Sequence, residues 1–189
     1  MKHEMNSQNT KQMLVDVLIT LLEKKPFSKI TVSEIVNLCN INRKTFYYHF
    51  ADVYDLFEWH LNHEIHNAVS LFDPLNDLDA TITYSVNYMN QHAYLRNSIQ
   101  DPILRDKIVH SLNKHIYPKA LEMIQELEHT HGKSMDTDFR DFLIKSLTHI
   151  TVLSILDAIE NPNNYDIEKI KQYLSTIFTT SVSGFFEQI

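Results

Sequence analysis

The stretch INRKTFYYHF, residues 41–50, concentrates cations and aromatic rings in a chain that is net acidic. Arg43 and Lys44 can donate hydrogen bonds to guanine N7 and O6, and their charges attract phosphate. On a helix, Tyr47 would lie one turn beyond Arg43, while Phe46 would point inward. The pattern therefore favours a helix that packs by its phenylalanines and presents Arg43, Lys44 and Tyr47 to base edges.

Three further residues of this stretch complete the predicted helix. Tyr48 and His49 lie on its flank, where their side chains can reach phosphates. Phe50 is one turn after Phe46 and can pack beside it. The plain alternative is an amphipathic helix with two surface cations, and these residues alone leave that alternative open.

A second chemically active group lies at residues 60–66, where His60, His63 and His66 recur every three positions beside Glu64. Neutral imidazoles and a carboxylate at such spacing can bind zinc or a related cation. Steps of three rotate around a helix, so one ion could not easily bind all three rings. Two interpretations stay open: a metal-responsive site made of these four residues, and solvated or hydrogen-bonded histidines.

A long helix and a short one are predicted in front of the cationic stretch. Apolar residues between residues 13 and 22 recur at the spacing of one helix face, and Pro26 ends this helix. TVSE, residues 31–34, is a capping box in which Thr31 and Glu34 can each satisfy one free amide. The second helix is short, and the side chains expected to face inward are Ile35, Val36 and Leu38.

A tight turn and two further helix starts follow. Asn40 tolerates the left-handed backbone that a sharp turn needs. Asn42 can cap a third helix, and Asp52 can cap a fourth that is expected to run to about Phe72. Two short helices joined by such a turn form a helix-turn-helix, whose second helix enters the major groove.

Residues 10–60 resemble the TetR/AcrR family of bacterial transcriptional regulators. The pattern that carries the resemblance is ITVSEIVNLCNINRKTFYYHFADVYDLF, above all TFYYHF with the capping box and the long first helix. The resemblance implies that Arg43, Lys44 and Tyr47 contact bases. It implies that phosphates are held by Thr31, Ser33, Thr45, Tyr48 and His49. The cap residue Asn42 completes the predicted DNA-binding set.

Two positions depart from the family pattern. Asn40 stands where the family commonly has glycine, and asparagine is conformationally compatible there. Val53 stands where many members have a lysine that contacts a phosphate. One phosphate contact is therefore expected to be missing.

The remainder of the chain is predicted to be helical. Apolar residues recur at helical spacing in the segments 79–99, 103–128, 136–160 and 166–186. The resemblance implies an all-α protein, with a helix-turn-helix DNA-binding domain over residues 1–52 and a helical effector-binding and dimerisation domain over residues 53–189. The last two segments are candidates for the four-helix interface of a homodimer, and monomer core is the alternative.

The effector is poorly specified by the sequence. NQHAYLRNSI and PILRDKI look loosely like a subgroup of dihydroxyacetone-kinase regulators, and the resemblance implies an effector that alters the spacing of the two recognition helices. An apolar pocket with polar tips could be lined by Phe72, Tyr84, Tyr88, Met89 and Tyr94. Plain core is the alternative for each of them.

Composition narrows the class of protein further. The formal net charge of −7 lies in residues 61–189, because residues 1–60 hold equal numbers of acids and cations. Two glycines leave few tight turns, so long helices joined by short loops are expected.

Cys39 has no partner for an internal disulfide. We identify no apolar run of about 18 residues and no leader, so we expect a cytoplasmic protein without a membrane partner.

Enzyme motifs are missing from the sequence: it has no Gly-rich phosphate loop, no G-x-S-x-G and no H-E-x-x-H. We therefore expect no enzymatic activity and no required cofactor. The predicted function is a TetR-type regulator, a repressor by family habit, that binds a palindromic double-stranded operator as a homodimer under small-molecule control. The alternatives are a zinc-responsive regulator of the same fold and an all-helical adaptor without DNA binding.

Overall fold

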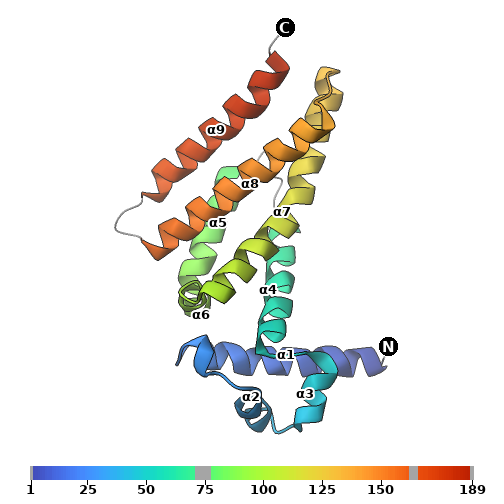
Figure 1. Ribbon diagram of the computed structural model, residues 1–189, viewed down its shortest axis with the longest axis vertical. Coiled ribbons are helices and arrows are strands. Elements are labelled where there is room, and N and C mark those ends of the chain that lie inside the picture. The colour runs from blue at the N-terminus through green and yellow to red at the C-terminus, as the bar shows by residue number, and fades with distance from the viewer. Residues whose placement is uncertain (1, 71–77, 162–165, 188–189) are drawn as a thin grey trace. The chain divides into compact units, whose positions relative to one another are not determined.

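The computed structural model describes residues 2–70, 78–161 and 166–187, and in this part of the chain all regular structure is helical (Figure 1). The elements are, in chain order, α1 (Lys2–Leu22), η1 (Phe27–Lys29), α2 (Val32–Leu38), α3 (Arg43–His49), α4 (Val53–Ser70), α5 (Leu78–Gln91), α6 (Ala93–Ser98), α7 (Pro102–His131), α8 (Thr137–Glu160) and α9 (Ile167–Glu187). The predicted all-α class, with an N-terminal helix-turn-helix, is confirmed.

The chain forms two compact units. Unit 1 comprises residues 1–64 and 92–108, and unit 2 comprises residues 65–91 and 109–189. The predicted division after residue 52 does not coincide with these units, because the chain passes between them within α4, between α5 and α6, and within α7. The start of α4 belongs to unit 1 because its side chains complete that core. The ring of Phe27 lies 4.5 Å from that of Tyr54 and 6.0 Å from that of Phe57.

Unit 1 is built on the apolar stripe of α1, whose Leu14 and Leu18 are fully buried. Ile35 and Val36 of α2 are also buried, as predicted. Leu38 is not, since 61% of its surface is exposed. The prediction that Leu38 faces inward was wrong: α2 is only seven residues long and buries one narrow side, and Leu38 lies away from it.

Caps fix the helix starts of unit 1. The Thr31 hydroxyl accepts a hydrogen bond from the Glu34 amide, and the Glu34 carboxylate pairs with Lys25. Asn40 has a φ of +52°, which is the left-handed turn conformation that was predicted. Asp52 accepts from the amide of Asp55 at 2.9 Å and so begins α4 as expected.

Unit 2 contains α5, α8 and α9, which pack against one another (Figure 1). One of its apolar clusters is centred on Ile124, Ile144 and Val182, drawn from α7, α8 and α9. The continuous helical segment predicted over 79–99 is instead two helices. The backbone breaks at His92, with φ −109° and ψ 88°, so that α5 ends at Gln91 and α6 begins at Ala93.

Helix α8 corrects the expectation that the chain has no long apolar run. By length and composition it could cross a membrane, with a mean hydropathy of 1.6 over 18 residues. Only 33% of that window is buried. One such helix is weak evidence for a membrane segment, because a helix with one apolar side in the core and another on the surface has the same composition.

Candidate nucleic-acid interface

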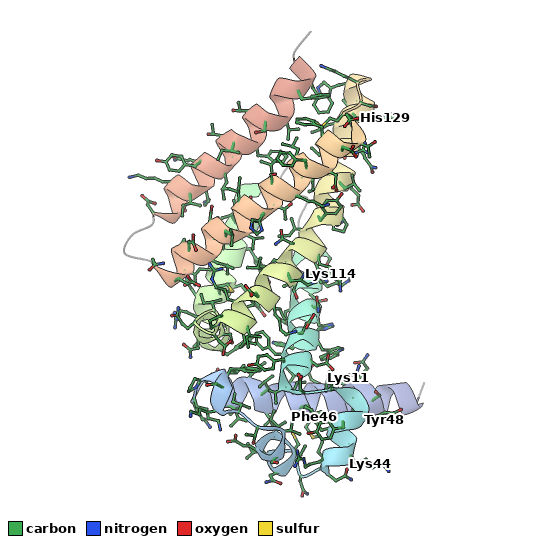
Figure 2. All side chains as sticks on the ribbon, in the orientation of Figure 1. Lys11, Lys44, Phe46, Tyr48, Lys114 and His129 are labelled. Carbon is green, nitrogen blue, oxygen red and sulfur yellow. The ribbon has the colours of Figure 1, made fainter. Side chains whose placement is uncertain are left out.

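Helix α3 separates its polar and apolar side chains onto opposite faces. Phe46 is fully buried, whereas Arg43 and Lys44 are exposed. Tyr48 is 73% exposed, and Figure 2 shows Lys44 and Tyr48 on the side of α3 opposite Phe46. The side chain of Asn42 begins the helix by accepting from the Thr45 amide at 2.8 Å. A capped helix thus presents a cationic face, which is the arrangement that the sequence predicted.

Arg43 and Tyr47 meet on this face. Nη2 of Arg43 donates to the Tyr47 hydroxyl at 3.1 Å, and the guanidinium carbon lies 5.8 Å from the centroid of the tyrosine ring. The pair is one helical turn apart, which is the spacing that brings side chains together. Two residues predicted to contact bases are therefore already in contact with each other.

The side chains predicted to hold phosphates lie at both ends of the helix-turn-helix. Thr31 and Ser33 are exposed at the start of α2. The Thr45 hydroxyl lies 3.1 Å from Oδ1 of Asn42 and so takes part in the cap of α3. At the other end of α3, the ring of Tyr48 packs edge-on against His49, with centroids 4.9 Å apart.

The charge of Lys11, a residue that the sequence analysis did not single out, acts on His49. Partial burial, and then the charge of Lys11, lower the pKa of His49 below its usual value. At neutral pH a neutral imidazole can still donate one N–H to a phosphate. The ring therefore suits a hydrogen bond to phosphate better than an ion pair.

Lys11 is held by aromatic rings between α1, the end of α3 and α4. Its Nζ lies 5.1 Å from the ring centroid of Trp59 and 5.7 Å from that of Phe50. The two rings are themselves 6.0 Å apart. Contacts between residues this far apart in the chain leave no local spacing pattern, so no sequence signal pointed to Lys11.

The candidate effector residues are divided between the units. Tyr84 and Tyr88 belong to α5 of unit 2, and their rings stack with centroids 5.8 Å apart. Met89 follows Tyr88 in the sequence and is half-buried. Tyr94 belongs to unit 1, where it is buried and its hydroxyl lies 2.8 Å from Nε2 of His60. Phe72 lies outside the described residues. A role of any of these residues in effector binding stays a prediction.

The histidines of α4 turn to three different partners. His60 meets Tyr94, the His63 ring stacks on Trp59, and the His66 ring lies 6.1 Å from that of His115. Within the described ranges, no three His, Cys, Asp or Glu side chains are grouped as a metal site would need. The rings do not converge with Glu64 on one ion, because the three-residue spacing rotates them around the helix. The zinc alternative gains no support.

Comparison with known families accounts for the helix-turn-helix. Residues 14–58 match the model described as bacterial regulatory proteins, tetR family. These residues are a tetR-family DNA-binding domain. The domain includes every residue of the predicted DNA-binding set, from Thr31 to His49. A search of the curated proteins found no match to the chain.

Solved structures show that the resemblance in fold extends beyond this domain. The chain is similar to a protein titled dihydroxyacetone kinase operon activator DhaS, with a TM-score of 0.64 over 92% of this chain and 96% of that one. It is also similar to the fatty acid degradation regulator FadR from Bacillus halodurans, with a TM-score of 0.61 over 88% and 93%. Both are 13% identical to it, so the likeness shows the fold alone. The family assignment therefore rests on residues 14–58, and the rest of the chain shares its fold with these two regulators.

Proposed function

We propose that this protein is a TetR-type transcriptional regulator. It is a homodimeric repressor that binds a palindromic operator in the cytoplasm and is controlled by a small-molecule effector. It acts by binding and not by catalysis. The observation that carries the proposal is the outward face of α3. Arg43, Lys44 and Tyr47 are exposed there on a capped helix whose other side is anchored by the buried Phe46.

Dimerisation through α8 and α9 is supported by apolar side chains that unit 2 leaves in solvent. Phe142 of α8 is 68% exposed and Tyr173 of α9 is 62% exposed. Others on the same two helices are Phe139, Ile150 and Ile177. A second copy could cover them by adding two helices to these two, which would remove this apolar surface from water.

The proposed interface is tested by changing one exposed ring. Phe142→Lys places a charge where the partner's apolar surface would lie, so sedimentation should show a monomer in place of a dimer. Lys119→Ala, at a partly exposed cation of unit 2, serves as the control and should leave the dimer unchanged. A Phe142→Lys protein that sediments as a dimer would contradict this interface.

Two recognition helices must lie about one DNA turn apart to bind both half-sites, so a small shift between them is enough to release DNA. We propose that an effector causes that shift, and that the half-buried Tyr84, Tyr88 and Met89 of α5 contribute to its site. Repression is the family habit, whereas DhaS is described as an activator. The direction of regulation therefore needs a transcription assay with and without the protein.

Fluorescence anisotropy on DNA from upstream of the protein's own gene tests the central proposal. We expect tight binding that weakens steeply with salt, because cations of the interface displace counterions from phosphate. Parallel titrations contain EDTA or added zinc, and equal affinity in both is expected. A zinc-dependent change would restore the metal-responsive alternative. Failure to bind this DNA, or any sequence enriched from a random pool, would favour the adaptor without DNA binding.

A further inference from the structure

We infer that Tyr47 is a positioning residue, whose hydroxyl holds the Arg43 guanidinium ready for one guanine in each operator half-site. The inference rests on the proposed function, since it concerns how the same α3 face recognises DNA. It goes further by assigning Tyr47 a role that acts through Arg43. It also predicts which base pair loses discrimination when the hydroxyl is removed.

The first step is that the tyrosine ring is itself fixed. It packs edge-on against Phe46, with centroids 5.6 Å apart and an interplanar angle of 85°. Phe46 is fully buried, so its own ring is held by the core of unit 1. Tyr47 remains 49% exposed, and its hydroxyl is thereby held at the surface by a rigid support.

The second step is that this hydroxyl restrains the arginine. Nη2 of Arg43 donates to the Tyr47 hydroxyl at 3.1 Å while the guanidinium lies 5.8 Å from the ring centroid. A free arginine would have to give up side-chain freedom on binding DNA. An arginine that is ordered beforehand loses less, which corresponds to about threefold to tenfold in affinity for one long side chain.

The third step is that the restraint leaves the arginine able to recognise a base. A guanidinium has five N–H donors, and a bidentate contact to guanine O6 and N7 needs two. Donation from Nη2 to Tyr47 therefore leaves donors for the guanine. The tyrosine hydroxyl acts as acceptor in this contact, so its own proton remains available for a phosphate or a base acceptor.

The experiment is selection of binding sites from a random DNA pool by the full-length protein, with sequencing of the enriched pool. The variants are Tyr47→Phe, Arg43→Ala and the double variant. Tyr54→Phe is the matched control, because it also removes a hydroxyl from a ring that packs against a phenylalanine, Phe27, but it lies on α4 outside the DNA-binding set. Tyr47→Phe keeps the ring against Phe46, and far-UV circular dichroism checks that each variant is folded.

The expected result is a half-site with one guanine whose preference disappears in Arg43→Ala. Tyr47→Phe should lower the preference for that same guanine about threefold to tenfold. In the Arg43→Ala background, Tyr47→Phe should have no further effect on it, which a merely structural role would not predict. Tyr54→Phe should leave every base preference as in the wild type.

Two different failures are distinguishable. If the wild type enriches a half-site and Tyr47→Phe keeps the full preference for guanine, the positioning role is overturned while the regulator stands. The same holds if Tyr47→Phe changes a different base pair in the Arg43→Ala background, because Tyr47 would then contact that base directly. If the wild type enriches no sequence, the proposed function fails and the inference fails with it.

Discussion

The two units of this protein obtain their helices in different ways. In unit 1, α2 and α3 have seven residues each, which is too short for a helix to be stable on its own. They form because side chains cap them and buried apolar side chains anchor them, Ile35 and Val36 in α2 and Phe46 in α3. In unit 2, α8 and α9 have 24 and 21 residues, and packing along their length stabilises them. The position of a short capped helix can therefore be predicted from the local sequence. The sequence of a long packed helix does not show in the same way what that helix does.

The largest expected effect is a loss of stability in the core of unit 1 that leaves the core of unit 2 unchanged. Phe46→Ala should lower the free energy of unfolding of unit 1 by about 3–5 kcal/mol, because it removes a fully buried ring. Trp59 is the only tryptophan and lies in unit 1, so its fluorescence reports that unit. Urea unfolding followed by Trp59 should therefore shift strongly to lower denaturant.

The counterpart in unit 2 is Ile144→Ala, at a side chain that is 1% exposed. It should lower stability by about 2–5 kcal/mol. We expect this change in the far-UV circular dichroism transition, with the Trp59 transition left in place. Equal shifts of the Trp59 transition in both variants would show that the units unfold as one, and the comparison would break.

The next effect concerns DNA. Arg43→Ala should weaken binding to the specific site by about 1–3 kcal/mol, since a bidentate contact to a base is lost. Anisotropy titrations at two salt concentrations measure it. Lys119→Ala removes a partly exposed cation of unit 2 and should leave affinity unchanged. Equal losses in the two variants would mean that the net cationic charge, and not the α3 face, governs binding.

Helix caps give a smaller effect and a sharper comparison. Asn42 caps α3, and Asp136 caps α8 by accepting from the amides of Asp138 and Phe139. Replacing either with alanine should cost about 1 kcal/mol of stability, which thermal unfolding measures. Only Asn42→Ala should also weaken DNA binding, because α3 carries the base-contacting side chains. Equal DNA affinity in the two variants would contradict that assignment.

The sequence alone predicted those features of the fold that depend on contacts between residues close together in the chain. The caps Thr31, Asn42 and Asp52 each act on an amide three residues away, and the left-handed Asn40 is a property of a single residue. These positions set the helix-turn-helix, and all were predicted. The match to the tetR family covers the same part of the chain.

Contacts between distant segments could not be predicted in the same way. Lys11 contacts Trp59 although the two residues are far apart in the chain. The backbone breaks at His92, where the sequence has neither proline nor glycine. Leu38 has the residue type of a core position but lies on the exposed side of a short helix. The histidines of α4 share a spacing, and only their separate partners show that they do not converge.

The smallest expected effect is a dependence of unit 1 on pH. His60 is buried against the Tyr94 hydroxyl, and burial lowers its pKa below the usual 6.5, partly opposed by the negative charge of Glu64. The folded protein therefore resists a proton that the unfolded chain accepts. Stability is fully present above pH 6.5 and decreases as the pH falls from there towards the lower pKa of the folded state.

The measurement is the Trp59 unfolding transition between pH 7.5 and 5, in buffers of equal ionic strength at about 0.15 M. His60→Gln should make the free energy of unfolding depend less on pH at the acid end, even if it lowers that free energy at every pH. The slope of stability against pH reports proton uptake, whereas a uniform loss of stability reports packing. The control is His129→Gln, at an exposed histidine of α7 in unit 2 (Figure 2), which should leave the slope as in the wild type. A slope that survives in His60→Gln would show that another group causes the acid sensitivity, and His49→Gln would then be the next variant to measure, because the pKa of His49 is also lowered.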